Sequence, residues 1–368
     1  MKARVIIGAN YGDEGKGTVT ATYTKYATGK VLNVLTNGGA QRGHSILTED
    51  GSFTFQHFGS GTCFGADNYY PAFYILNPMQ FVEEYEDLFE RDVIQKVKIF
   101  RDKQCRWSTP YDMMANQILE HKRDKNKHGS CGMGIWETIL RYQCTVTMDI
   151  DQFCTLDTVD QKKYLKTIRD YFEKRIGAIP AEYKMAWYDE NTMDHFIRDC
   201  DFLKAKTSSL FDVANYDEII FENGQGLLLN DTGFDVAGTT PSKTGVDYAL
   251  QLMKKFGCDD VELHYVTRPY MTKHGRGEFE FEADRRVVST YVNEDRTNHY
   301  NRFQEDFRYG MLNIEDLRNR IETDAKKLDN QLHYTYKLEV THCDEMDRLA
   351  EFGKYFHNIN TYDCALIK

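Results

Sequence analysis

The chain has 368 residues, a formal net charge of −11 and a hydrophobic content of 41%. This length favours one large α/β domain with a sizeable core, and the negative charge argues against a protein that binds nucleic acid. No apolar run approaches the roughly 20 residues that span a bilayer, and no secretory signal precedes the first strand, so we expect a cytoplasmic protein without membrane contact. The nine cysteines form no Cys-x-x-Cys pair, which predicts reduced thiols rather than a zinc site or disulfides.

The hydrophobic pattern predicts strands and helices in alternation along the chain. Predicted strands cover residues 5–7, 31–36, 93–100, 218–222, 261–267 and 337–342; predicted helices cover residues 18–26, 78–90, 111–124, 159–175, 246–256 and 315–328. This order predicts an α/β fold with a mostly parallel central sheet and helices on both faces. No linker divides the chain, so we expect a single domain over residues 1–368 with helical insertions at about 105–210.

The most informative segment is residues 8–18, which read Gly-Ala-Asn-Tyr-Gly-Asp-Glu-Gly-Lys-Gly-Thr. A glycine-rich turn between a strand and a helix presents backbone N–H groups and a helix N-terminus to an anion. Lys16 adds a full positive charge for a phosphate, and Asp13 adds a carboxylate that can serve as metal ligand or base. Six residues separate Gly8 from Gly15, and Gly17 follows Lys16, so the loop is not an ordinary Walker A motif.

Two motifs in this region resemble the adenylosuccinate synthetase family. Residues 11–17, Tyr-Gly-Asp-Glu-Gly-Lys-Gly, are similar to its Trp-Gly-Asp-Glu-Gly-Lys-Gly, and residues 38–45, Gly-Gly-Ala-Gln-Arg-Gly-His-Ser, are similar to its Gly-Gly-x-Asn-Ala-Gly-His-Thr. The resemblance implies a P-loop-like nucleotide-binding architecture. It also implies that Asp13 is the base at purine N1, that His44 is the general acid at the phosphoryl group, that Lys16 takes part in catalysis, and that Mg²⁺ is held by Asp13 and Gly43.

The implied reaction explains these residue types. A 6-oxopurine carbonyl is a poor electrophile, but loss of the N1 proton makes O6 nucleophilic enough to take a γ-phosphoryl group. The amine of L-aspartate then displaces the phosphate from C6. This scheme needs a carboxylate at N1, a proton donor at the phosphoryl group and a metal ion that bridges phosphates.

Further motifs extend the resemblance to the two nucleotides. Residues 129–134 look like the family's Gly-Thr-Thr-Gly-x-Gly phosphate loop, and residues 221–226 look like its Phe-Glu-Gly-Ala-Gln-Gly. One family arginine crosses a dimer interface to the acceptor phosphate, so the resemblance also implies a homodimer. The implied acceptor contacts are Asp13, Gln41, Ser130, Cys131, Arg141, Gln225 and Thr240. The implied donor contacts are Gly12, Gly15, Lys16, Gly17, Thr18, Thr341 and Asp344.

The identity of the donor stays open between GTP, ATP and their deoxy forms. Asp344 matches a family aspartate that accepts hydrogen bonds from guanine N1 and N2, which favours GTP or dGTP. His342 replaces the lysine of the family's Thr-Lys-x-Asp. This departure keeps ATP as an alternative donor.

The segment 301–313 departs most from cellular family members. They carry four arginines in the loop that binds the carboxylates of L-aspartate, a task that suits the guanidinium fork. Here Arg302 and Arg308 are left, with Gln304 between them. This spelling is similar to the phage 2-aminoadenylosuccinate synthetases, which accept dGMP and serve diaminopurine-containing DNA in the host cytoplasm.

The sequence leaves open which nucleotide is the acceptor and whether the protein is an enzyme of this type. The 301–313 segment and Gln41 favour dGMP, whereas Asp13 favours IMP, because some phage members replace that aspartate. A purine-nucleotide-binding protein without catalysis is another alternative, although such a protein has no need of Asp13, Lys16 and His44 together. A P-loop kinase or GTPase is a further alternative, against which the Walker spacing counts.

Overall fold

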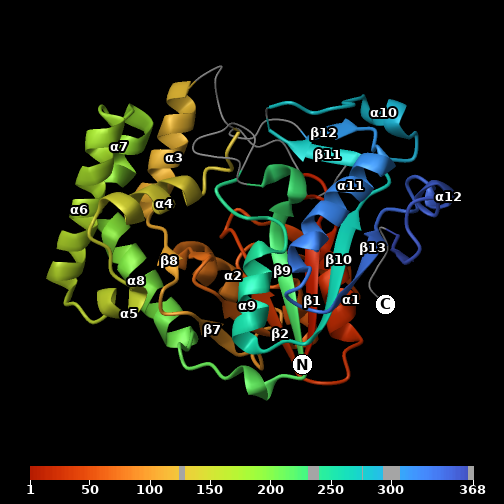
Figure 1. Ribbon diagram of the computed structural model, residues 1–368. Coiled ribbons are helices and arrows are strands. Elements are labelled where there is room, and N and C mark those ends of the chain that lie inside the picture. Colours follow the sequence, from red (N-terminus) through yellow and green to blue (C-terminus); the bar gives the residue numbers. More distant parts are fainter. Residues whose placement is uncertain (124–128, 231–239, 276, 293–306, 364–368) are drawn as a thin grey trace.

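The computed structural model describes residues 1–123, 129–230, 240–275, 277–292 and 307–363. Within these residues, an eight-stranded sheet forms the centre, with the order β14-β13-β10-β1-β9-β2-β5-β7 (Figure 1). Every neighbouring pair is parallel. Its strands are β1 (Lys2–Gly8), β2 (Val31–Leu35), β5 (Asp67–Tyr70), β7 (Ile99–Arg101), β9 (Glu218–Gly226), β10 (Asp260–Thr267), β13 (Tyr334–Val340) and β14 (Ile359–Thr361).

Short strand pairs sit outside this sheet. Antiparallel pairs join β3 (His44–Thr48) to β4 (Gly51–Phe55) and β11 (Met271–His274) to β12 (Phe307–Gly310), and a parallel pair joins β6 (Ile75–Leu76) to β8 (Arg106–Trp107). In Figure 1 the β11–β12 pair lies above the sheet, next to α10 (Arg285–Val288). The hairpin β3–β4 begins at His44, a predicted catalytic residue, whose side chain contacts Glu222 of the central strand β9.

Helices cover both faces of the sheet because the central strands are apolar on both sides. Val5 and Ile7 of β1 pack with α9 (Asp247–Phe256) and α11 (Ile314–Ala325) in one core cluster. Ile6 points to the opposite face, where it packs with Val19 of α1 (Lys16–Lys25). The predicted fold class, a parallel α/β sheet covered on both faces, is confirmed.

A second apolar core lies in a helical layer at one side of the sheet, on the left of Figure 1. It is built from α2 (Pro78–Glu90), α3 (Pro110–Arg123), α4 (Ile135–Cys144), α5 (Ile150–Phe153), α6 (Thr158–Ile176), α7 (Ala181–Tyr188) and α8 (Glu190–Lys206). Trp107, Phe153 and Trp187 are fully buried in it. Asp149, Asp157 and Asp189 cap helix N-termini, which satisfies free backbone amides. The single-domain assignment of residues 1–368 stays a prediction.

Most predicted elements match observed ones within a few residues. The clearest error is the strand predicted over 93–100, because β7 covers only Ile99–Arg101. The amides of Val93 and Ile94 donate to Leu88 O and so close the C-terminal turn of α2 instead of entering the sheet. The last helix, α12 (Leu349–Phe352), was not predicted. Among the described residues, no helix is both long and apolar enough to span a membrane.

Candidate active site

The loop that follows β1 is closed by its own charged side chains. The Glu14 carboxylate accepts the backbone N–H groups of Asn10 at 2.9 Å and Gly12 at 2.8 Å. Lys16 Nζ donates to Gly12 O at 2.5 Å and pairs with Glu14 Oε2 at 3.2 Å, and the lysine side chain is buried. Two backbone amides of the loop therefore converge on one anion, the carboxylate of Glu14; the phosphate contact of this loop stays a prediction.

Two glycines let this loop approach the segments that carry the other predicted residues. Gly15 has a φ of +89°, and a Cβ on it would lie 3.1 Å from Thr341 Cγ2. Gly12 has a φ of +123°, and a Cβ there would lie 3.1 Å from Gln225 Cα. Both positions need a left-handed backbone and close contact, so glycine is required at each. The loop thus contacts the predicted donor residue Thr341 on one side and the predicted acceptor residue Gln225 on another.

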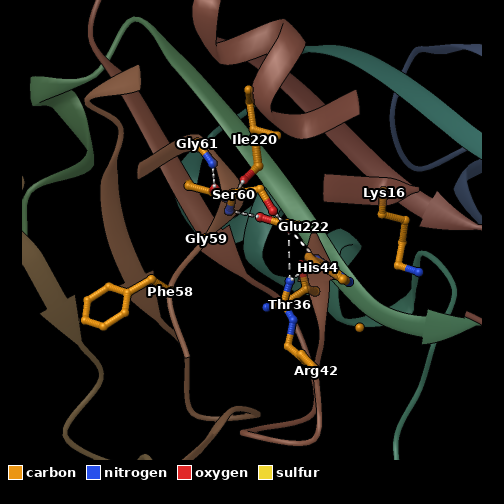
Figure 2. Close-up of polar contacts among 12 residues, drawn as sticks. Lys16, Thr36, Arg42, His44, Phe58, Gly59, Ser60, Gly61, Ile220 and Glu222 are labelled. Atoms are coloured by element: carbon orange, nitrogen blue, oxygen red, sulfur yellow. Dashed lines mark hydrogen bonds and ion pairs between the residues drawn. The ribbon is translucent and has the colours of Figure 1, made fainter. Parts of the chain in front are cut away.

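His44 lies at the centre of a buried polar cluster, drawn in Figure 2. Its Nδ1 forms a short hydrogen bond with Glu222 Oε1 from β9. The same carboxylate accepts Ser60 N at 3.0 Å and Ser60 Oγ at 2.7 Å, and Arg42 Nη2 lies 3.4 Å from it. Glu222 therefore fixes the orientation of the His44 ring, in the manner of a carboxylate that orients a catalytic histidine.

The charges of this cluster favour a neutral histidine and an ionised glutamate. Burial and the neighbouring Arg42 lower the pKa of His44 to about 4, although Glu222 acts in the opposite direction. Burial favours the neutral form of Glu222, but the hydrogen bonds and charges of His44, Arg42 and Ser60 outweigh it and lower its pKa to about 2. We therefore assign Nδ1–H of neutral His44 as the donor to the Glu222 carboxylate, which directs Nε2 away from Glu222.

Asp13 lies at the edge of this loop beside residues from β10 and β11. Arg268 Nε donates to Asp13 O at 2.6 Å, and His274 Nε2 lies 3.8 Å from Asp13 Oδ2. No group of three His, Cys, Asp or Glu side chains suited to a metal occurs in the described part of the chain. The Asp13 carboxylate and the exposed backbone of Gly43 still fit Mg²⁺, which takes one or two protein oxygens and completes its shell with phosphates and water.

Two of the predicted acceptor residues carry side-chain amides near the loop. Asn37 Nδ2 donates to Gln225 Oε1 at 3.4 Å, and a Cβ on Gly38 would lie 2.8 Å from Gln41 Nε2. Both amide atoms of Gln41 are buried without a hydrogen-bond partner among the described residues. Buried amide groups normally have partners, so the amide of Gln41 has unused hydrogen-bonding capacity in this structure. Thr240 is buried, and its N–H donates to Leu229 O.

The 129–134 loop packs on α3 rather than on the 9–15 loop. Ser130 Oγ donates to Asn116 Oδ1 at 3.1 Å, and Gln117 Nε2 donates to Gly132 O at 3.2 Å. Burial raises the pKa of the Cys131 thiol to about 11, so this side chain is a neutral thiol at pH 7. The phosphate role of Ser130 and Cys131 stays a prediction.

Arg141 lies inside the helical layer, apart from the other predicted residues. Its side chain is fully buried, its Nε and Nη2 donate to the Asp112 carboxylate at 2.8 and 3.1 Å, and Nη2 also donates to Trp107 O. The predicted phosphate contact would require this buried pair to open.

The residues predicted to bind L-aspartate are only partly described. Arg302 and Gln304 lie outside the described residues. Arg308 on β12 makes a bidentate pair with Glu282, at 2.8 and 2.5 Å. Lys273 lies opposite Arg308 in the β11–β12 pair, and its buried Nζ is 4.9 Å from the centre of the Tyr11 ring. Two cations from the β11–β12 strand pair thus lie near the loop that follows β1.

On the donor side, Thr341 Oγ1 donates to Glu14 O at 2.6 Å, whereas Asp344 is exposed at the surface. Gly17 and Thr18 open α1 directly after the loop: Gly17 is buried, and a Cβ on it would lie 3.1 Å from His44 Cβ. The strand ends therefore bring Gly12, Asp13, Gly15, Lys16, Gly17, His44, Gln225 and Thr341 into one region.

Comparison with known proteins agrees with this geometry. Residues 5–351 match the protein family described as adenylosuccinate synthetase. The chain belongs to this family. The adenylosuccinate synthetase of Acaryochloris marina is 26% identical over 295 residues, covering 75% of this chain and 61% of that protein. The one from Lactobacillus acidophilus is 26% identical over 238 residues, covering 62% and 53%. The chain therefore spans between half and two thirds of the length of these adenylosuccinate synthetases.

Two solved structures of related synthetases share the fold. The fully ligated adenylosuccinate synthetase of Plasmodium falciparum has a TM-score of 0.67 at 18% identity, covering 93% of this chain and 77% of that chain. The succinoaminodeoxyadenylate synthetase (PurZ) of cyanophage S-2L, bound to dGMP and dATP as an energy donor, has a TM-score of 0.62 at 11% identity, covering 98% and 91%. At these identities the likeness establishes the fold alone.

Sequence reasoning missed several residues of this adenylosuccinate synthetase-type site. Glu222 was noted only as part of a motif, and Arg268, Lys273 and His274 received no role. The available signal was a charged side chain at the end of an otherwise apolar strand, because burial of such a group requires a partner. Glu222 ends the run Ile-Ile-Phe, and Arg268 directly follows β10.

Replacing Glu222 by Gln removes the anion that orients His44 but keeps the size of the side chain. We expect kcat to fall by about 10² to 10⁴, the usual contribution of an acid–base group. Turnover kinetics at pH 7 measure this. The Glu222→Gln variant leaves the buried Arg42 without its anion, which can itself destabilise the protein. The matched control is therefore the double variant Glu222→Gln/Arg42→Met, which also removes the unpaired cation. The double variant should regain thermal stability but not activity; near-normal kcat in either variant contradicts the orienting role.

The Asp112–Arg141 pair predicts a large effect on stability. Asp112→Ala leaves a buried guanidinium without its anion, which costs about 3–5 kcal/mol in the free energy of unfolding. Urea unfolding at pH 7 measures the change. Asp87→Ala is the control, because it breaks an exposed pair with Arg91 and should cost less than about 1 kcal/mol. Equal, small losses in both variants would contradict a structural role for Arg141.

Proposed function

We propose that this protein is a purine nucleotide ligase that joins L-aspartate to C6 of a 6-oxopurine nucleotide through a 6-phosphoryl intermediate. dGMP is the favoured acceptor, and the product is then N6-succino-2-amino-2′-deoxyadenylate for diaminopurine-containing phage DNA. The observation that carries this proposal is the His44–Glu222 pair beside the Asp13–Lys16 loop. A protein that only binds nucleotides has no need of an oriented histidine next to a phosphate loop.

In the first step, Asp13 accepts the N1 proton of the acceptor purine, and O6 attacks the γ-phosphorus of the donor. The bond from that phosphorus to the β,γ-bridging oxygen breaks, and the nucleoside diphosphate leaves with the electron pair. Lys16 exchanges its contacts with Gly12 O and Glu14 for the phosphates, so the loop amides are freed for the same anion. Bound Mg²⁺, held by Asp13 and Gly43, would neutralise phosphate charge. A phosphoryl group at Nε2 of His44 places the ring between two anions, which favours the imidazolium that can donate a proton.

In the second step, the amine of L-aspartate forms the C6–N bond, the C6–O6 bond breaks, and phosphate leaves with the electron pair. His44 donates a proton to the leaving phosphate, and the nitrogen loses a proton as the product forms. Arg308, together with Arg302 and Gln304, binds the carboxylates of L-aspartate. For Arg308 this means exchanging the Glu282 carboxylate for that of the substrate.

Support for dGMP comes from Gln41 and the 301–313 segment. Both amide atoms of Gln41 are buried without a hydrogen-bond partner among the described residues. The 2-amino group of guanine is a hydrogen-bond donor that hypoxanthine lacks, and the amide oxygen of Gln41 can accept from it. The S-2L synthetase with this fold is bound to dGMP. IMP is the second candidate, because Asp13 is retained and the curated relatives are adenylosuccinate synthetases.

We further propose that GTP, ATP or a deoxy form of either is the phosphoryl donor. We also propose that the protein is a homodimer and that it acts in the host cytoplasm.

The direct test is phosphate release with Mg²⁺, L-aspartate and GTP or ATP, with dGMP, GMP or IMP as acceptor. We expect turnover that requires L-aspartate and is fastest with dGMP. Turnover with IMP alone would instead support an adenylosuccinate synthetase. Phosphate release that ignores L-aspartate would indicate a kinase- or GTPase-like activity.

Asp13→Ala and His44→Ala should each abolish turnover and leave the fold intact, because they remove the base and the acid while the sheet is unchanged. A loss of at least about 10²-fold in kcat is expected from removal of an acid–base group. Steady-state kinetics and circular dichroism measure the two properties. Activity close to that of the unmodified protein in either variant would contradict the assigned role.

The Glu282 carboxylate should compete with the carboxylates of L-aspartate for the Arg308 guanidinium. Glu282→Gln frees the guanidinium, so the KM for L-aspartate should fall by up to about fivefold, which corresponds to the worth of a partly exposed ion pair. Glu280→Gln is the matched control, because it removes the same charge two residues away from an exposed position. An unchanged KM in Glu282→Gln, or an equal fall in both variants, would speak against Arg308 as the aspartate ligand.

A further inference from the structure

The segment 341–345, where the donor base is proposed to bind, is tied to the backbone of the catalytic loop. Thr341 follows β13, and its N–H donates to Thr267 O of β10 at 2.9 Å. The Thr341 hydroxyl donates to Glu14 O at 2.6 Å. This first link fixes one carbonyl of the loop against the end of β13.

A second link runs through side chains that begin at the other end of the same segment. The Tyr270 hydroxyl donates to the Glu345 carboxylate in a short hydrogen bond. Arg268 Nη1 donates to the Tyr270 oxygen at 3.2 Å, and Arg268 Nε donates to Asp13 O at 2.6 Å. The chain of contacts therefore reads Glu345, Tyr270, Arg268, Asp13, and it ends on the residue proposed as the base.

Both links are buried, so water does not replace them readily. Tyr270 is 1% exposed, Glu345 5% and Arg268 6%. Arg268 donates toward both ends: one run of donors goes from the guanidinium to the Tyr270 phenol and on to the Glu345 carboxylate, and the other goes from the same guanidinium to Asp13 O. In the first run, each hydrogen bond polarises and strengthens the next. The planar guanidinium holds its two acceptors at fixed angles, which a flexible ammonium cannot do.

The conformation of the 341–345 segment allows a bound ligand to influence this series of hydrogen bonds. His342 has a φ of +57°, and Glu345 N donates to His342 O at 3.1 Å, so residues 342–345 form a tight turn. Asp344 is exposed in that turn, directly before the buried Glu345. A purine base held by Asp344 would therefore restrain the turn and, through it, the Glu345 carboxylate.

We propose that Arg268 and Tyr270 are positioning residues that couple occupation of the donor-base segment to the placement of Asp13. This inference rests on the proposed function, because it takes the donor base to bind at Thr341 and Asp344. It adds that donor and acceptor bind synergistically: a restrained 341–345 turn fixes the Asp13 and Glu14 carbonyls, and Asp13 then meets the acceptor purine in one position. By linkage, each nucleotide must tighten the other by the same factor.

The test is the affinity for dGMP, measured by titration calorimetry with and without a non-hydrolysable analogue of the triphosphate that supports turnover, in the presence of Mg²⁺. In the unmodified protein the analogue should tighten dGMP binding by about tenfold, within the usual range for coupled sites. Tyr270→Phe removes only a hydroxyl and should abolish this synergy. The affinity for dGMP alone should be unchanged, and kcat should fall while the KM for dGMP measured with saturating donor rises.

Tyr265→Phe is the matched control. Tyr265 is a buried tyrosine on β10, five residues before Tyr270, and its hydroxyl donates to the buried Asp324 at 3.0 Å, outside the chain of contacts. This variant loses the same kind of hydrogen bond and should keep the synergy. Arg268→Lys is the second variant: it keeps the charge but not the two-pronged geometry, so it should lose the synergy as Tyr270→Phe does.

The inference is overturned if the unmodified protein shows no synergy, or if Tyr270→Phe retains it. It is also overturned if Tyr265→Phe loses it equally, because the effect would then report general loosening of β10. These outcomes are distinct from failure of the proposed function, in which the unmodified protein shows no turnover dependent on L-aspartate with any acceptor.

Discussion

The site depends on one buried anion, the carboxylate of Glu222. This side chain comes from β9 in the middle of the sheet and contacts two segments that are distant from it in sequence. They are the 38–44 turn, through Arg42 and His44, and the 3₁₀ turn at Ser60. Arg42, His44 and Ser60 together compensate for the burial of this carboxylate, so no single partner carries the whole compensation. The same requirement that holds the segments together therefore fixes the ring of His44.

The catalytic loop is closed in a similar way. The Glu14 carboxylate accepts the amides of Asn10 and Gly12 and pairs with Lys16, so one anion holds both the backbone and the charged side chain of the loop. Under the proposed function, the phosphates of a nucleotide would take the place of this carboxylate. Arg308 and Glu282 form a similar internal ion pair, in which a carboxylate of the protein binds the guanidinium.

The sequence predicted what local patterns determine. Alternating apolar runs predicted the parallel sheet, and the glycine-rich spelling placed Asp13 and Lys16 after β1, where the structure has them. It did not predict contacts between distant segments, such as Glu222 with His44 or Arg268 with Asp13. Arg141 is an example: its phosphate contact stays a prediction, and no local pattern indicated its buried pair with Asp112, 29 residues earlier. Val93 and Ile94 are β-branched, which favours a strand, but their amides donate to Leu88 O at the C-terminal end of α2.

The central claim is that O6 of the acceptor is phosphorylated before L-aspartate displaces it. The most direct measurement uses acceptor labelled with ¹⁸O at O6 and mass spectrometry of the phosphate released during turnover. Since the C6–O6 bond breaks and the oxygen leaves with phosphorus, the account predicts one ¹⁸O in each phosphate and none in the nucleotide product. Unlabelled phosphate would contradict the account, because it would mean that the triphosphate is hydrolysed by water.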